Sequence, residues 1–160
     1  MTGVDISDVA IHTARIHAEK QGLEIKYLNC EAEDLLPAEK ESYDLVTCLE
    51  AIEHVPDPAK LVETCSNLCK SGGPIVFSTI NRNPKSFLFA IIGAEYILNL
   101  LPKGTHEYKK FIKPSELSSM MRDNFLEVIE VIGMSYNPIT KNYWLGKDVD
   151  VNYLIHAKKK

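Results

Sequence analysis

The sequence predicts an α/β fold built on a mainly parallel sheet. Apolar, strand-like runs alternate with helical segments through the first half of the 160 residues, and two further strands close the chain. Single Gly, Pro and Ser residues stand where these segments should begin and end. The length favours one domain, residues 1–160, and is sufficient for a hydrophobic core.

In the first half, each expected strand is followed by a polar loop or a helix. Ser7 is a suitable N-cap for the first helix, and Gly22 fits its C-terminal end. Pro56 and Pro58 open the second helix, and Pro74 stands at the first position of a strand, where it is tolerated. The predicted strands are 2–6, 24–28, 43–49 and 74–80, the predicted helices are 8–21 and 56–70, and 29–42 is an acidic loop.

The second half is expected to hold two helices and then two strands. The predicted helices are 87–101 and 115–123, the predicted strands are 125–134 and 149–157, and 137–147 is a hairpin-like connection. Ligands of parallel sheets bind at the carboxyl ends of the strands. We therefore expect the loops after Val4, Leu28, Leu49 and Ile80 to line the site.

Composition excludes several functional classes. A net charge of −4 and a pI near 5.7 argue against nucleic acid as a partner. No basic region precedes an apolar one at the N-terminus, so no signal peptide is expected. The cysteines have no C-x2-C spacing, which disfavours zinc and favours four reduced thiols: Cys30, Cys48, Cys65 and Cys69.

Two acidic positions suit a nucleoside cofactor. Asp5 ends the first strand, where a carboxylate can accept hydrogen bonds from ribose hydroxyls. It can equally be an Asp at a strand-to-helix turn, near the positive end of the helix. Glu31 opens an acidic stretch in which one carboxylate could accept from an adenine amino group. By itself, a solvated acidic loop is the better interpretation of that stretch.

The cluster of Glu50, Glu53 and His54 follows a buried strand. On a helical turn, residues three and four apart share a face, so these three side chains could converge. Two carboxylates and an imidazole would suit a divalent cation with open positions. The alternative is a solvated polar turn in which His54 caps or packs locally.

The segment 87–101 is apolar around most of its circumference, but its 15 residues are fewer than the roughly 20 of a spanning helix. An apolar helix followed by cations suits a membrane surface or a lipid substrate, and it equally suits a buried helix that covers the sheet. The basic residues that follow it are Lys103, His106, Lys109, Lys110 and Lys113.

Several stretches together resemble one family. Residues 44–57 resemble the segment after the fourth sheet strand of class I methyltransferases. Residues 77–86, 93–106, 110–116 and 148–153 resemble the ubiquinone-biosynthesis O-methyltransferases. The resemblance covers essentially the whole chain. It implies S-adenosylmethionine as cofactor, a divalent cation such as Mg²⁺, and polyprenylated catechol or hydroquinone substrates, including 3-demethylubiquinol.

By position, the resemblance assigns roles to individual residues. Asp5, with Ile6, would bind the ribose, Glu31 and Ala32 would lie at the adenine edge, and Leu49 would contribute through its backbone. Glu50, Glu53 and His54 would hold the cation, which would bind the catechol and lower its pKa. His54 or His106 acting as a general base is a weaker alternative.

The resemblance also implies a lipid- or substrate-facing insertion over 84–113, with the membrane contact at 87–113. The expected location is the cytoplasmic face of a bacterial inner membrane, or the matrix face in mitochondria. Other ubiquinone-biosynthesis proteins are possible partners.

The family carries a strand and a glycine-rich loop upstream of the segment that matches Gly3–Asp5, so the domain is expected to be N-terminally incomplete. Without that strand, its two neighbours would pair directly with each other, or a gap would remain, or a partner would take its place. The alternatives are a non-catalytic fragment or a lipid- or partner-binding module. A nicotinamide-dependent oxidoreductase is disfavoured, because no G-x-G-x-x-G follows a strand.

Overall fold

The computed structural model describes residues 1–87, 107–137 and 140–160. Most of the expected helix over 87–101, the basic residue Lys103 and the candidate base His106 lie outside these residues. The chain forms two compact units, residues 1–40 and 41–160, which are described separately. That residues 1–160 form a single domain therefore stays a prediction.

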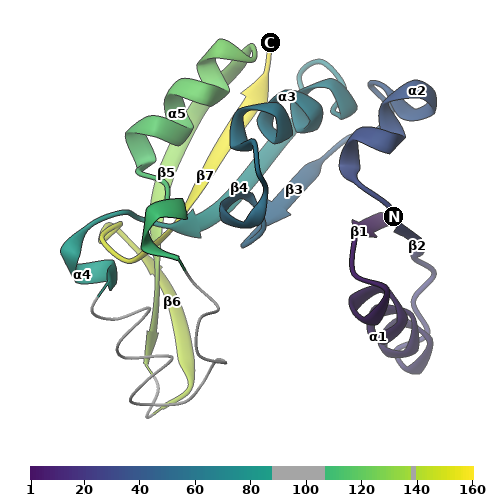
Figure 1. The fold of residues 1–160 in the computed structure, drawn as a ribbon, viewed down its shortest axis with the longest axis horizontal. Coiled ribbons are helices and arrows are strands. Elements are labelled where there is room, and N and C mark those ends of the chain that lie inside the picture. Colours follow the sequence, from purple (N-terminus) through teal and green to yellow (C-terminus); the bar gives the residue numbers. More distant parts are fainter. Residues whose placement is uncertain (88–106, 138–139) are drawn as a thin grey trace. The chain divides into compact units, whose positions relative to one another are not determined.

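Unit 1 (residues 1–40) holds a pair of parallel strands and a helix (Figure 1). The Oγ of Ser7 accepts from the amide of Ala10, which confirms the N-cap, and Gly22 has a φ of 66°, which confirms the expected end of the helix. Ile11, Ala18 and Leu35 are its buried apolar side chains. Its elements are β1 (Thr2–Asp5), α1 (Asp8–Lys20), β2 (Lys26–Asn29), η1 (Ala32–Leu35) and α2 (Leu36–Glu39).

The acidic stretch 29–42 is more ordered than the loop that the sequence predicts. The carboxylate of Asp34 accepts from the amide of Glu31 at 3.1 Å and so caps the start of η1. Pro37 stands at the start of α2, where its missing N–H costs nothing. Two short helical turns therefore replace the expected loop.

Unit 2 (residues 41–160) is built on a five-stranded sheet with the order β3-β4-β7-β5-β6. β3 and β4 are parallel, and β7 lies between β4 and β5 and is antiparallel to both. β3, β4 and β5 therefore run in one direction, and their carboxyl ends share one edge of the sheet. The strands are β3 (Val46–Leu49), β4 (Pro74–Ile80), β5 (Leu126–Asn137), β6 (Asn142–Gly146) and β7 (Asn152–Lys159).

Two helices cover one face of this sheet (Figure 1). Asp57 caps the first of them by accepting from the amide of Lys60. The fully buried side chains include Phe77 of β4, Tyr153 and Ile155 of β7, and Leu117 and Met121 of the second helix. The helices are α3 (Pro58–Leu68) and α5 (Pro114–Asp123), and the shorter turns are η2 (Ile52–His54), α4 (Pro84–Ser86) and η4 (Tyr108–Lys110).

The α/β class and the antiparallel C-terminal strand are confirmed. The sheet is less parallel than expected, because the connection 137–147 contains a further strand, β6, that pairs with an extended β5. Across this pair the rings of Tyr136 and Tyr143 lie 4.5 Å apart, a cross-strand contact that stabilises the hairpin. Among the described residues, β1 pairs only with β2, and β3 only with β4.

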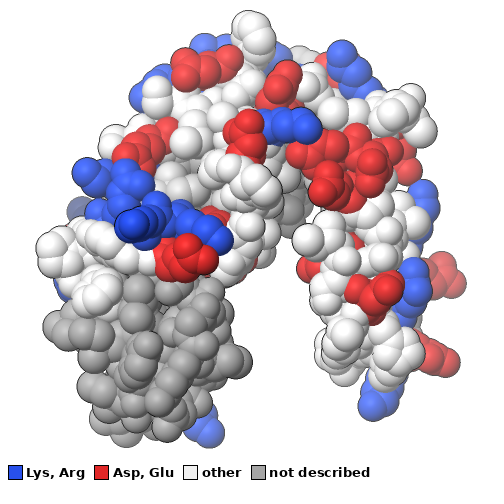
Figure 2. Space-filling view, viewed as in Figure 1, with Lys and Arg blue, Asp and Glu red and all other residues white. Residues whose placement is uncertain are grey.

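On the face that Figure 2 presents, several Lys and Arg side chains gather in one cluster, and several Asp and Glu side chains gather in another. The whole chain carries a net charge of −4.

Candidate active site

The backbone fixes Asp5 at the carboxyl end of β1. Its carbonyl accepts from Nδ2 of Asn29, the residue opposite it in β2, at 3.0 Å. Its Oδ1 accepts from the amide of Ser7 at 2.7 Å, which forms an Asx-turn at the start of α1. No described residue donates to Oδ2 of Asp5. That oxygen is therefore available to a ligand hydroxyl, as the ribose prediction requires. The next residue, Ile6, is 75% exposed.

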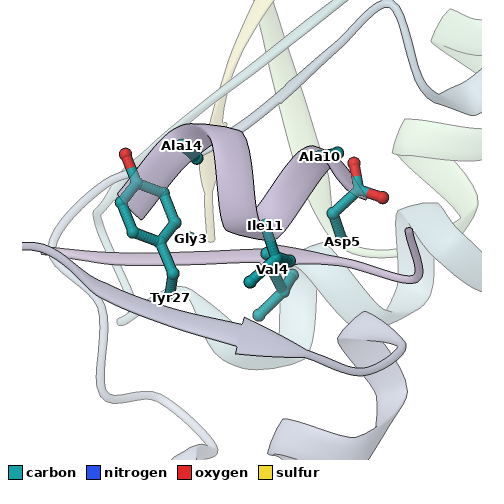
Figure 3. A pocket seen from close by; sticks show the side chains of 7 residues that line it. All are labelled: Gly3, Val4, Asp5, Ala10, Ile11, Ala14 and Tyr27. Atoms are coloured by element: carbon teal, nitrogen blue, oxygen red, sulfur yellow. The ribbon is translucent and has the colours of Figure 1, made fainter. Parts of the chain in front are cut away.

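A small apolar cavity borders Asp5 (Figure 3). Its volume is about 190 Å³, and Asp5 lies at one end and Tyr27 at the other. A Cβ on Gly3 would stand 2.9 Å from the Tyr27 ring, so glycine is required for this close packing. Ligand pockets usually exceed about 300 Å³. The cavity therefore cannot enclose a whole nucleoside, and only its acidic rim suits a ribose.

Glu31 and Ala32 stand at the start of η1, where the side chain of Glu31 is exposed. A carboxylate there can reach solvent or an amino group of a ligand. Its position agrees with the adenine-edge prediction without testing it.

In unit 2, Glu50 follows β3 in a strained backbone conformation. Its φ is +52°, in the left-handed region that non-glycine residues rarely occupy. Its amide donates to the carbonyl of Ser78 at 3.1 Å, and Ser78 Oγ donates to Glu50 Oε1 at 2.6 Å. Asn152 Nδ2 donates to Oε2 at 3.3 Å. Such conformations persist only where the surroundings over-determine them, and they cluster at functional sites.

Glu53 is a buried carboxyl with one unpaired oxygen. The residue is 3% exposed, and Thr79 Oγ1 donates to its Oε2 at 2.8 Å. Oε1 is buried and has no hydrogen-bond partner in the described part of the chain. Burial raises the pKa of Glu53, and the charge of Glu50 adds to this, while the Thr79 hydrogen bond and His54 oppose it.

The predicted convergence of Glu50, Glu53 and His54 is not found. Residues 50–54 do not form an α-helical turn, because Glu50 is left-handed and η2 begins only at Ile52. The two carboxylates bind adjacent residues of β4, Ser78 and Thr79, whose side chains point to opposite faces of the sheet. Within the described ranges, no three Asp, Glu, His or Cys side chains are grouped to hold a metal ion.

The remaining predicted site residues of unit 2 are at the surface. Leu49, the last residue of β3, is 53% exposed, so its backbone lies at an accessible strand end. His54 is exposed at the end of η2.

Sequence reasoning missed Ser78, Thr79 and Asn152. Ser78 and Thr79 are buried in the apolar run of β4, and buried polar groups need partners. Two hydroxyl residues in a central strand were the signal that could have identified them. Asn152 contacts Glu50 across 102 residues of sequence, and such a long-range contact leaves no local pattern.

Comparison with known proteins defines the class. The family model described as "Methyltransferase domain" matches residues 1–77. A possible histamine N-methyltransferase from Thermotoga maritima is 26% identical, with a TM-score of 0.68 over 99% of this chain and 72% of that one. The [4+2]-cyclase SpnF, 11% identical, superposes with a TM-score of 0.68 over 99% of this chain and 66% of that one, which shows the fold alone. The fold and the matched segment define an S-adenosylmethionine-dependent methyltransferase domain.

Curated relatives narrow the class. Ubiquinone biosynthesis O-methyltransferases from Saccharophagus degradans and Marinobacter nauticus are 54% and 56% identical over 160 residues, 99% of this chain. The relative from Nitrosospira multiformis is 57% identical over 97% of it. The chain belongs to the family of ubiquinone biosynthesis O-methyltransferases. It spans 68%, 67% and 65% of the lengths of these three relatives.

Proposed function

We propose that the chain forms most of an S-adenosylmethionine-dependent O-methyltransferase of ubiquinone biosynthesis. Its substrates would be polyprenylated catechols or hydroquinones, and one reaction would be the conversion of 3-demethylubiquinol to ubiquinol. The observation that carries this proposal is the 54% identity to a curated relative of that name over 160 residues, which include both units.

Unit 1 would bind the nucleoside end of the cofactor. Oδ2 of Asp5 would accept a hydrogen bond from a ribose hydroxyl, because Oδ1 is already occupied by Ser7. Glu31 would accept from the adenine amino group, with Ala32 and Ile6 beside the ligand. S-adenosylmethionine would supply the sulfonium-bound methyl group that is transferred in line to oxygen.

Unit 2 would prepare the phenolic oxygen. A phenol titrates near pH 10, so its proton has to be drawn away for attack. Glu50 presents a carboxylate whose direction Ser78 and Asn152 fix. It would accept a hydrogen bond from the phenol and orient its lone pair, and such positioning supplies much of the rate of displacement reactions. The O–C bond forms as the S–C bond breaks, and the proton leaves to water or to a nearby base.

The divalent cation remains a separate prediction. Binding by Glu50, Glu53 and His54 would require the two carboxylates to leave Ser78 and Thr79. The unpaired buried Oε1 of Glu53 supports some further ligand at this position. The roles proposed for Asp5 and Glu50 do not depend on the cation.

Membrane association through 87–113 is likewise proposed and fits a prenylated substrate. The location would be the cytoplasmic face of a bacterial inner membrane, or the matrix face in mitochondria, where other ubiquinone-biosynthesis proteins could be partners. In the described part of the chain, no helix is both long enough and apolar enough to cross a bilayer.

Cofactor binding and methyl transfer test the proposal. Calorimetric titration with S-adenosylhomocysteine should show saturable binding, and Asp5→Ala should weaken it about 10- to 100-fold, the equivalent of one charge-assisted hydrogen bond. Asp8→Ala, an exposed carboxylate three residues further on, is the matched control and should bind normally. Glu50→Gln should lower methylation of a short-chain demethylubiquinol while leaving cofactor affinity unchanged.

Absence of binding by a folded sample would favour the non-catalytic alternative. The cation is tested separately, by measuring turnover in the presence of Mg²⁺ and after divalent cations have been chelated. Equal rates in the two conditions would refute the cation without affecting the rest of the proposal.

A further inference from the structure

Two asparagines of the loop after β4 hold the stretch of chain just before β7. This stretch belongs to no helix or strand, so regular sheet pairing does not fix it. The backbone amide of Asn81 donates to the carbonyl of Val151 at 2.8 Å, and its Nδ2 donates to the carbonyl of Val149 at 2.9 Å. Nδ2 of Asn83 donates to the carbonyl of Asp150 at 2.5 Å. Three successive carbonyls are thus bound by one short loop.

The extended backbone of this loop explains why the two asparagines bind the same stretch. Asn83 has a φ of −150° and a ψ of 169°, and side chains two residues apart lie on the same side of an extended chain. Arg82, which stands between the asparagines, binds a different segment, because its Nη1 donates to the carbonyl of Phe111 at 3.2 Å. The sequence Asn-Arg-Asn therefore directs two amides to the stretch before β7 and one guanidinium to the segment before α5.

Asn152, the first residue of β7, directly follows this stretch and contacts the candidate site. Its Nδ2 donates to Oε2 of Glu50 at 3.3 Å. Its Oδ1 is buried and has no hydrogen-bond partner among the described residues. The direction of this side-chain amide therefore depends on its bond to Glu50 and on where the backbone places residue 152. A shift of the three preceding residues would move it.

Lys85 also contacts the stretch before β7, since it pairs with Asp148 and Asp150 at 2.7 and 3.0 Å. The side chain of Lys85 is 42% exposed and the two carboxylates are 56% exposed, and such exposed ion pairs contribute little. Asn81, by contrast, is only 9% exposed, and the loss of a buried hydrogen bond is costly because it leaves a polar group unpaired. The asparagines, rather than the lysine, are therefore the main supports of this stretch.

We propose that Asn81 and Asn83 are positioning residues for methyl transfer. They hold the stretch before β7 and, through Asn152, fix the direction of the Glu50 carboxylate. This inference rests on the proposed function, in which Glu50 accepts a hydrogen bond from the phenol. Ser78 already binds the other oxygen of Glu50, at 2.6 Å. Two bound oxygens fix the plane of a carboxylate, whereas one leaves it free to turn, and a misplacement of about 1 Å can cost about 100-fold in rate.

The side-chain amide of Asn152 reports its own placement without any turnover. Its signal in a nitrogen–proton correlation NMR spectrum of the whole chain is identified by its loss in Asn152→Ala. Asn81→Ala and Asn83→Ser should both shift this signal. Serine at position 83 keeps the cap of α4, which accepts from the amide of Ser86, and removes only the donor to Asp150. Asn83→Ser therefore carries the test even if Asn81→Ala does not fold.

Turnover tests the effect on the reaction. Asn81→Ala and Asn83→Ser should each lower kcat about 10-fold or more and leave the affinity for S-adenosylhomocysteine unchanged. In a Glu50→Gln background neither should lower kcat further, because the carboxylate that they orient is gone. Asn124→Ser is the matched control, since Nδ2 of Asn124 also donates to a backbone carbonyl, that of Met120 at 2.9 Å, but at the C-terminal end of α5. It should change neither the NMR signal nor kcat.

Three results would overturn this inference, and they are distinguishable. One is an unchanged Asn152 signal in both variants, and another is a loss of kcat that persists in the Glu50→Gln background. Normal turnover of Asn81→Ala and Asn83→Ser beside a slow Glu50→Gln protein would overturn it while the proposed function stands. Normal turnover of Glu50→Gln itself would refute the proposed role of Glu50, and this inference with it.

Discussion

At the scale of the residue, Tyr153 links β7 to the segment that precedes α5 in unit 2. It is fully buried on β7, and its hydroxyl donates to the carbonyl of Ile112 at 2.8 Å. Burial raises the pKa of Tyr153 above its ordinary value, and the charges of Glu53, Glu116 and Glu50 act in the same direction.

We expect Tyr153→Phe to lower the free energy of unfolding by about 1–3 kcal/mol at neutral pH, because it leaves a buried carbonyl unpaired. A group with a raised folded pKa stabilises the protein below its unfolded pKa, and this contribution is lost as the pH rises. Wild-type stability should therefore fall above about pH 10, by up to about 1.4 kcal/mol per pH unit from this residue.

Urea unfolding near pH 8 and pH 11 measures both effects. The alkaline slope should be smaller in Tyr153→Phe than in Tyr143→Phe, whose tyrosine is 67% exposed. Equal slopes in the two variants would show that the ionisation of Tyr153 is not linked to folding.

The predictability of single residues from sequence depended on how local their contacts are. Ser7 and Asp5 bind backbone groups two or three residues away, so their spacing indicated their roles. Glu50 and Glu53 bind residues 26–28 positions further on in β4. A spacing rule for helices could not foresee those partners. Among the described residues the two carboxylates bind adjacent positions of β4, and no three possible metal ligands are grouped.

At the scale of the element, one glycine sets the path of β5 where the strand leaves β7 for β6. A Cβ on Gly133 would lie 1.7 Å from the carbonyl oxygen of Asp148, whereas a Cβ on its cross-strand partner Gly146 would meet nothing closer than 3.9 Å. Gly133→Ala should thus force the backbone apart and cost about 1–3 kcal/mol of stability.

Gly146→Ala is the matched control and should change stability by less than about 0.5 kcal/mol. Chemical denaturation followed by circular dichroism compares the two variants. A Gly133→Ala protein as stable as the control would mean that the 148–150 segment can move aside freely.

Elements with clear boundary signals were predicted well. β4 begins at Pro74 and ends at Ile80, as its apolar run indicates, and α5 begins at Pro114. β6 was missed because apolar and polar residues do not alternate along its sequence, Asn142–Gly146. Its pairing with β5 depends on a cross-strand partner that composition does not reveal.

At the scale of the whole molecule, the two units have very different cores. Unit 1 buries three apolar side chains around a two-stranded sheet, while unit 2 buries most of the core beneath five strands. Two-stranded sheets are marginally stable by themselves. We therefore expect amides of β1 and β2 to exchange with deuterium more than about 100-fold faster than those of β4 and β7, through local opening.

Hydrogen exchange followed by mass spectrometry tests this directly, and cofactor binding should slow exchange in β1 and β2 if Asp5 contacts the ligand. Uniform protection across both units would show that they unfold together. The sequence predicted the α/β class but not this division, because length and periodicity do not report how many contacts join two segments.

The place of β7 between β4 and β5 has a consequence for how the protein is made. Residues 152–159 complete hydrogen bonding to residues 74–80, synthesised much earlier, and to residues 126–134. The sheet cannot close until residue 159 has been synthesised, so the edges of β4 and β5 that pair with β7 stay unpaired until then. Premature termination before residue 152 would leave two apolar strands with nothing between them, a product suited to aggregation and to proteolysis.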